Sequence, residues 1–470
     1  MKSFPPSVLL FGALLLMSPP APADDRPAPP ALAGALKSYF ATTDAAQREA
    51  LARAIAADPA YRPANLGEAL NRLPLWPALS PGAFEIDVKV GFGQVRTITL
   101  RIPKGYRPDR PWPLLLCYHS SGSNGPSILR HTEQLLGPAV DQYVLAAPSS
   151  YRQTSLDAPP PFTPEHPLMV REIKKAVHVD SDRVFALGYS LGGYMAWTLA
   201  LFHSDLFAGA MPMASTISVP GDLEGGWQQL PRNLAHLPVL HVWGSADRLN
   251  VPGFEGRNQF AGTMASFNES FSPLIAQDGF TTITENRIAG AGHGGANPRP
   301  ESLAQLLQHT RVRWPKKVQH QYRHLHQGSA YWLEANAWQG DGYFDFDRKV
   351  ERRQGESWPQ AYGRVFLPLL GELSGEVQGQ KIVVKTRHVG ELTVWLAPEL
   401  IDLEQPIEIE LDGKKVFTGK VAPDLAVALA QAERTRDFER LRWAGVRIDA
   451  SGQAKVVDSS TSFAPLLGKP

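Results

Sequence analysis

Cysteine is nearly absent from this chain of 470 residues, which contains only Cys117. A single thiol cannot form an intramolecular disulfide, so covalent cross-links within the chain are excluded. The fold must therefore depend on the burial of a hydrophobic core. A chain of this length can supply a large core and more than one domain.

An excess of charge of one sign is also missing, because 47 Lys and Arg residues balance 46 Asp and Glu residues. Nucleic acids and anionic membranes attract basic surfaces, so the balance argues against both as partners. Beyond the first residues, no segment is apolar enough to span a bilayer. His320, His324 and His326 have no spacing typical of metal ligands, and we expect neither a metal nor another cofactor.

The first 23 residues have the composition of an export signal. Lys2 precedes an apolar run over residues 8–17, and Ala21-Pro22-Ala23 offers a small-residue cleavage site before Asp24. This run is about half as long as a membrane-spanning helix requires. We therefore expect a signal peptide over residues 1–23 and a secreted or periplasmic protein.

Changes of hydrophobic period divide the rest of the chain into three parts. Residues 24–80 contain a Pro/Ala-rich linker and short amphipathic helices, which we expect to pack on the main domain. Residues 81–315 begin with two alternating strands and continue as short apolar runs separated by helices, the pattern of a mostly parallel α/β sheet. Residues 316–470 are predicted to form a β-rich accessory domain, with a hairpin turn at Asp412-Gly413.

The apolar runs predict individual elements. Expected strands of the central sheet cover residues 114–118, 143–147, 184–187, 207–211, 239–243 and 282–288. Expected helices lie near residues 169–177, 195–202 and 302–310. The C-terminal part should contain strands at 381–386, 392–396, 407–411 and 415–417, and a helix at 425–439.

The pentapeptide around Ser190 matches the pattern G-x-S-x-G, with Gly188 and Gly192 at its ends. Small flanking residues are needed where a strand turns sharply into a helix and presents a serine hydroxyl. The pattern occurs by chance in many chains. Here, however, an expected strand precedes it and an amphipathic helix follows it directly. We predict that Ser190 is a nucleophile.

A serine hydroxyl is a poor nucleophile unless a base and an orienting acid follow on later loops. His293 lies in the glycine-rich loop 289–295, directly after an expected strand. Asp247 follows the strand expected at 239–243. We predict that His293 is the base and Asp247 the acid, with Asp222 and Asp278 as weaker alternatives because acidic residues are common in turns.

Residues 115–125 form a strand followed by a loop rich in small residues, which begins with His119. Such a loop is typical of oxyanion holes of the His-Gly-Gly type, although Ser120 stands where glycine is common. The predicted donors are the backbone N–H groups of Leu191 and of Ser121 or a neighbour in the loop. We expect His119 to brace this loop.

These motifs, carried by residues 182–194 and 243–248, resemble the α/β-hydrolase superfamily. The chain is most similar to secreted esterases and predicted peptidases around the dienelactone-hydrolase, polyhydroxybutyrate-depolymerase and prolyl-oligopeptidase-like groups. The resemblance covers roughly residues 84–315. It implies a mostly parallel sheet flanked by helices and a Ser-Asp-His triad, and it leaves the substrate open.

We expect this site to hydrolyse a carboxylic ester, on a small molecule or a polymer, through an acyl-enzyme on Ser190. Loops 149–167 and 217–231 are expected to line the substrate cleft. Peptide hydrolysis by the same triad is the alternative, although the residues before the core are too few for a substrate-filtering propeller.

A non-catalytic protein that binds polysaccharide through the C-terminal domain is the third hypothesis. Aromatic side chains can stack on sugar rings, but they more often fill a core. The aromatic residues in question are Tyr331, Trp332, Trp338, Tyr343 and Phe344.

Overall fold

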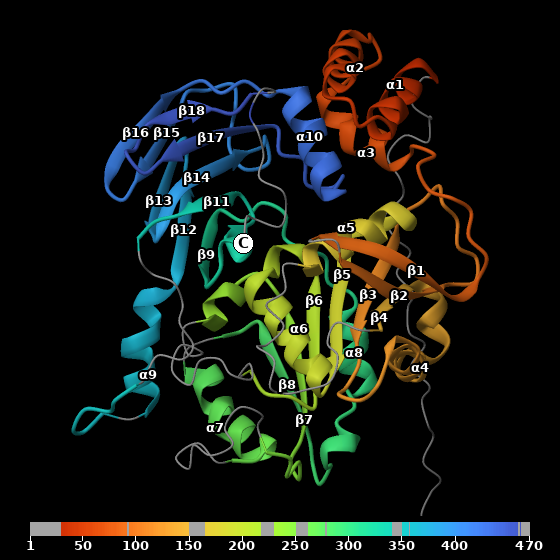
Figure 1. Ribbon diagram of the computed structural model, residues 1–470, viewed down its shortest axis with the longest axis vertical. Helices are drawn as coiled ribbons and strands as arrows, with labels where there is room; N and C mark the ends of the chain where they lie inside the picture. Colours follow the sequence, from red (N-terminus) through yellow and green to blue (C-terminus); the bar gives the residue numbers. More distant parts are fainter. Residues whose placement is uncertain are drawn as a thin grey trace, which may run out of the picture.

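The computed structural model describes residues 30–91, 94–149, 165–217, 230–250, 262–277, 280–340, 350–356, 358–458 and 461. Two regions built on sheets lie one above the other, with a group of short helices beside the upper one (Figure 1). The expected signal peptide lies outside the described residues.

The lower region is built on a mixed sheet with the strand order β1-β2-β4-β3-β5-β6-β7-β8. β1 pairs antiparallel with β2, and β2 antiparallel with β4, whereas the other neighbours pair in parallel. Every residue of β3, β4, β6 and β7 is buried, as parallel strands covered on both faces require. The strands are β1 (Gly82–Gly91), β2 (Gln94–Ile102), β3 (Trp112–Tyr118), β4 (Val144–Pro148), β5 (Val179–Tyr189), β6 (Gly209–Met213), β7 (Val239–Gly244) and β8 (Ile283–Ile288).

Five helices cover the two faces of this sheet, which confirms the predicted fold class. Apolar side chains of α4 (Gly125–Leu136) and α8 (Pro300–Leu306) belong to the hydrophobic cluster on one face. Those of α5 (Glu165–Ala176), α6 (Leu191–Phe202) and α7 (Met264–Gln277) belong to the cluster on the other. Within the described part of the chain, no helix has both the length and the apolar composition needed to cross a bilayer.

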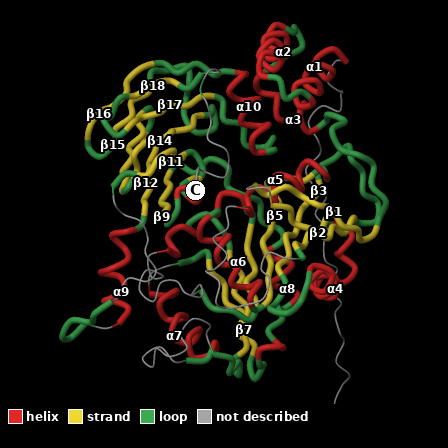
Figure 2. Tube along the Cα trace, in the orientation of Figure 1, coloured by secondary structure: helices red, strands yellow, loops and turns green. Residues whose placement is uncertain are grey.

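The upper region contains two five-stranded sheets, ordered β10-β11-β14-β17-β18 and β16-β15-β13-β12-β9. Side chains from both enter one hydrophobic cluster, and Figure 2 shows the strands gathered beside each other. The strands are β9 (Lys317–Tyr322), β10 (Ser329–Ala330), β11 (Leu333–Trp338), β12 (Gly371–Gln378), β13 (Lys381–Arg387), β14 (Val389–Leu396), β15 (Ile407–Leu411), β16 (Lys414–Gly419), β17 (Ala444–Asp449) and β18 (Ala454–Val456).

Local chemistry shaped two features of this upper region. Asp412 (φ 50°) and Gly413 (φ 81°) turn β15 into β16, as the Asp-Gly pair predicts. The late helix, α10 (Leu425–Thr435), ends earlier than expected because Arg436 adopts a left-handed conformation with φ 52°.

A further helix, α9 (Trp358–Phe366), leaves the upper region, and Phe366 joins the hydrophobic core of the lower one.

The N-terminal helices contradict one expectation. Apolar residues of α1 (Pro30–Ala41), α2 (Ala45–Ala57) and α3 (Leu66–Asn71) lie in the hydrophobic cluster of the upper region, not in that of the main domain. Figure 1 shows these helices beside α10. The ring of Phe40, for example, meets that of Phe438 edge-on at 5.4 Å. The helical period predicts which face is apolar, but it does not predict which part of the chain will cover it.

Buried ion pairs join the two regions. Arg311, which is 5% exposed, binds Asp437 of the upper region at 2.7 and 3.0 Å and Asp182 of β5 at 3.0 Å. Arg440 pairs with Asp205 at 2.9 Å. Burial by itself would raise the pKa of Asp437, but the neighbouring cations, Arg311 foremost, hold that pKa well below its usual range. The charged side chains at the contact between the two regions are buried, so each one is stabilised by its oppositely charged partner.

This network predicts a large effect for Arg311→Met. The substitution leaves two buried carboxylates without their shared partner, which typically costs about 3 kcal/mol of unfolding free energy. Arg53→Met is the matched control, because Arg53 pairs with Glu49 on an exposed helix surface and such pairs contribute less than about 1 kcal/mol. Denaturant unfolding measures both, and equal shifts for the two variants would contradict the assigned role of Arg311.

Candidate active site

Ser190 stands at the sharp turn between β5 and α6. Its backbone is in a strained conformation, with φ 55° and ψ −115°. Residues that have a side chain rarely adopt a positive φ, and the strain of this conformation costs on the order of 1–3 kcal/mol. The turn is held by the Ser190 N–H, which donates to the carbonyl oxygen of Met213 in β6 at 2.9 Å. The serine hydroxyl is thereby directed away from the strand that carries it.

The glycines of the motif are required by close backbone contacts. A Cβ on Gly188 would collide with the carbonyl of Gly192, and a Cβ on Gly192 would collide with the carbonyl of Tyr118 in β3. A Cβ on Gly193 would likewise collide with the carbonyl of Met213. Only residues without a side chain let the first turn of α6 approach the sheet this closely.

The structure brings the side chains of Ser190, Asp247 and His293 into one hydrogen-bonded chain. His293 Nε2 lies 2.9 Å from Ser190 Oγ, and His293 Nδ1 lies 2.7 Å from Asp247 Oδ2. Asp247, only 1% exposed, also accepts the N–H of Leu249 at 3.0 Å. Because the carboxylate can only accept, Nδ1 carries the ring proton, and Nε2 is left to accept from the serine hydroxyl.

The weaker candidates for the acid, Asp222 and Asp278, lie outside the described residues, as do most of the two loops expected to line the cleft. His241 is buried below the site and contacts the carbonyl oxygen of Ser215 at 3.1 Å and Glu285 at 3.5 Å. Burial raises the pKa of Glu285, but hydrogen bonds, that with His241 foremost, lower it overall. His241 and Glu285 are cross-strand partners on the neighbouring strands β7 and β8.

The predicted oxyanion donors occupy suitable elements. Leu191 is the first residue of α6, where backbone N–H groups have no partner within the helix. Ser121 lies in a turn in which the N–H of Ser123 donates to the Ser120 carbonyl at 3.2 Å. His119 is buried and contacts the same carbonyl at 2.8 Å, so it braces this loop. The roles of Leu191 and Ser121 remain predictions.

Three residues around His293 had no functional assignment from the sequence. Tyr189 donates its hydroxyl to the carbonyl oxygen of His293. His131 of α4 places Nε2 2.9 Å from Oδ1 of Asn297, four residues beyond the histidine. Tyr189 occupies a variable position of the G-x-S-x-G pattern. Because it directly precedes the nucleophile, the sequence could have indicated that it lies at the site. Nothing in the sequence linked His131 to the site, because the contact spans 166 residues.

In the residues that the structure describes, no group of three or more His, Cys, Asp or Glu side chains is arranged to hold a metal ion. The histidines after the core are engaged otherwise. His320, for example, is buried and lies 2.7 Å from the carbonyl oxygen of Gln327.

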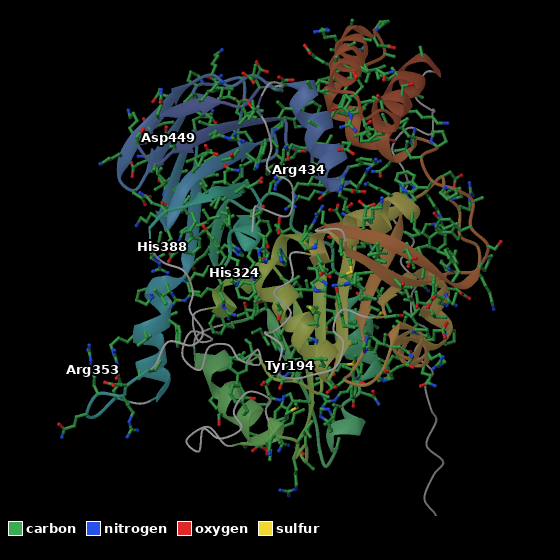
Figure 3. All side chains as sticks on the ribbon, in the orientation of Figure 1. Tyr194, His324, Arg353, His388, Arg434 and Asp449 are labelled. Carbon is green, nitrogen blue, oxygen red and sulfur yellow. The ribbon has the colours of Figure 1, made fainter. Side chains whose placement is uncertain are left out.

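The strand order, the helices on both faces and the strained serine between β5 and α6 define the α/β-hydrolase fold. Figure 3 labels Tyr194, one turn after the serine, in the lower region, below Arg434 of α10.

Comparisons with known proteins agree with this class. The model of the prolyl oligopeptidase family matches residues 168–223, which contain the serine and the helix after it. A putative esterase, NocK of Nocardia uniformis subsp. tsuyamanensis, is 32% identical over 203 residues, 40% of this chain and 54% of that protein. The chain thus spans about half the length of this curated relative.

Solved structures overlap about half of the chain. A thermostable esterase is 21% identical with a TM-score of 0.37, covering 49% of this chain and 63% of its own. A feruloyl esterase module from Clostridium thermocellum is 13% identical with a TM-score of 0.35, covering 49% and 90%. A putative dipeptidyl aminopeptidase IV from Bacteroides ovatus is 14% identical with a TM-score of 0.36, covering 48% and 36%. The fold assignment rests on the strand order and the serine turn, not on these overlaps.

The crowding around the glycines predicts the effect of Gly192→Ala. The added methyl group must push α6 away from the Tyr118 carbonyl, because backbone cannot yield as a flexible side chain does. We expect a loss of about 1–3 kcal/mol in unfolding free energy, typical of overpacking. Gly34→Ala, where a Cβ meets nothing within 4 Å, is the control. A Gly192→Ala protein as stable as this control in thermal unfolding would contradict the close approach.

Proposed function

We propose that this protein is a serine hydrolase that cleaves carboxylic esters through an acyl-enzyme on Ser190. The observation that carries the proposal is the hydrogen-bonded chain from Ser190, at the end of β5, through His293 to Asp247, which follows β7. Its parts have the geometry that nucleophilic catalysis by serine requires. The similarity to a putative esterase supports the choice of an ester as substrate.

The reaction follows from the positions of the three side chains. Ser190 Oγ attacks the ester carbonyl carbon while His293 Nε2 takes the hydroxyl proton, and Asp247 stabilises the imidazolium that forms. The backbone N–H groups of Leu191 and Ser121 are the proposed donors to the tetrahedral oxyanion, each worth about 3 kcal/mol of barrier. Collapse of the intermediate breaks the bond to the alcohol, which leaves with the proton from His293. Water, activated by the same histidine, then releases the acid and restores Ser190.

Peptide hydrolysis is the second candidate, because the family model that matches residues 168–223 describes prolyl oligopeptidases. The similarity to a putative esterase extends over 203 residues, a longer match than that of the family model, and it favours the ester.

Of the aromatic side chains that were expected to bind polysaccharide in the upper region, those that the structure describes are mostly not available at its surface. Trp332 is fully buried and Tyr331 is 3% exposed, so neither can stack on a sugar ring. Trp338 is half-buried and stacks on His388 at 5.4 Å, whereas Tyr343 and Phe344 lie outside the described residues. We therefore assign the buried aromatics to the core that the upper region shares with α1 to α3, and propose a small-molecule or polymer-borne ester as the substrate.

A series of p-nitrophenyl esters from acetate to octanoate tests the proposal. Because p-nitrophenolate leaves readily, a competent triad should hydrolyse several of these esters. Replacing Ser190 by alanine should lower kcat by about 10⁴-fold or more, since the acyl-enzyme can no longer form.

Ser204→Ala is the matched control, because Ser204 is a buried serine at the far end of α6. Short peptide p-nitroanilides, assayed in parallel, separate the two candidate reactions. Serine-dependent turnover of the anilides without any turnover of the esters would replace the esterase by a peptidase.

We propose further that the protein is exported to the periplasm or secreted, on the basis of the apolar run and the small residues before Asp24. Expression of the full chain in a Gram-negative host should yield a mature protein that begins at Asp24. Leu10→Arg interrupts the apolar run and should keep the uncleaved chain in the cytoplasm, because a charged signal core is not recognised. N-terminal sequencing of both fractions gives the result, and Met1 on protein from the unmodified chain would contradict export.

A further inference from the structure

The loop that carries His293 contains four glycines in the seven residues 289–295. Two of them, Gly292 and Gly294, have no positive φ, and a Cβ there would meet no atom closer than 3.9 Å. Neither crowding nor backbone conformation requires glycine at these positions. Glycine gives the backbone access to more conformations than other residues do. Contacts with other segments therefore help to fix the position of the imidazole.

Before the histidine, the segment after β7 holds the loop. The Ala246 N–H donates to the carbonyl oxygen of Ala291 at 2.9 Å. The Gly290 N–H donates to Ser245 Oγ at 2.8 Å.

Two further contacts hold the backbone at the histidine and beyond it. The hydroxyl of Tyr189 donates to the carbonyl oxygen of His293 itself. Beyond the histidine, Oδ1 of Asn297 lies 2.9 Å from Nε2 of His131 on α4. The rings of His131 and Tyr189 meet edge-on at 5.3 Å, so the two anchors support each other. His131, Tyr189 and Asn297 form what we call the histidine clamp.

Tyr189 precedes Ser190 in the chain, which gives the clamp a particular consequence. The strained turn after β5 fixes both the nucleophile and the anchor for its base. The distance between Ser190 Oγ and His293 Nε2 then depends in part on this turn, together with the contacts of the loop after β7. Burial raises the pKa of the Tyr189 hydroxyl above its usual value, so the hydroxyl keeps the proton that it donates to the carbonyl.

Other roles for these side chains fit the contacts less well. The Tyr189 hydroxyl proton points to a backbone carbonyl, so it is not directed at a developing oxyanion. The Nε2 of His131 is taken up by Asn297, which leaves it no part in proton transfer to the serine. We propose that Tyr189 and His131 are positioning residues, which hold the loop so that His293 Nε2 faces Ser190 Oγ. This inference rests on the proposed hydrolysis at Ser190.

Tyr189→Phe tests the clamp, because it removes one hydroxyl and keeps the ring. Without the anchor, His293 spends less time in line with the serine. We expect kcat for p-nitrophenyl butyrate to fall by about tenfold with an unchanged KM, since misplacement of a catalytic group affects the chemical step. The rate of labelling by a fluorophosphonate should fall by the same factor, because this reaction also needs His293 to take the Ser190 proton.

Tyr106→Phe is the matched control. The Tyr106 hydroxyl also bonds to backbone, accepting the N–H of His178 at 3.1 Å, but it lies before the start of β3, at the opposite end of the sheet from the serine. This variant should keep the parental kcat even where its melting temperature falls. A loss of kcat in Tyr189→Phe with a parental melting temperature separates positioning from general destabilisation.

Replacement of His131 provides a second measurement. His131→Gln retains an N–H donor for Asn297 and should keep most of the activity, whereas His131→Leu removes the donor and should lower kcat several-fold. A parent protein that hydrolyses no ester overturns the proposed function and the clamp together. An active parent whose Tyr189→Phe and His131→Leu variants retain parental kcat overturns the clamp alone.

Discussion

The close approach of α6 to β3 is the constraint on which the site depends. Gly192 lies against the Tyr118 carbonyl, and this contact brings the first turn of the helix beside the loop that begins at His119. The same approach forces Ser190 into its positive φ and exposes its hydroxyl. One packing requirement thus produces the nucleophile, the end of a helix with free N–H groups and the neighbouring loop together.

The acid and the base reach the serine by a different route. Asp247 and His293 follow neighbouring parallel strands, β7 and β8, whose carboxyl ends lie at the same edge of the sheet as that of β5. Asp247 is buried, whereas His293 lies half-exposed in a glycine-rich loop. The site therefore combines a fixed acid, a fixed nucleophile and a base whose backbone is tied to both.

The sequence predicted the local elements of the hydrolase region well, because parallel buried strands leave strong apolar runs. It also selected the three residues that the structure places in one hydrogen-bonded chain, since motif and strand order restrict the choice. It did not predict α4 or α7. The partner of α1 to α3 was predicted wrongly, and His131 was missed, because such contacts join residues far apart in the chain and leave no periodic pattern. The shortened α10 depended on the backbone of Arg436, which composition does not reveal.

The shared core of α1 to α3 with the upper region has a consequence for the order of assembly. Leu36, Ile55 and Leu70 are synthesised before the whole hydrolase sheet, yet the cluster that buries them includes Phe438 and Trp443, which follow that sheet. The intervening hydrolase sheet can form from nearer neighbours. Closing so long a loop is slow, since contacts distant in the chain form late. The apolar face of α1 to α3 therefore stays uncovered until the upper region has been synthesised, and chains with such exposed faces are prone to aggregate.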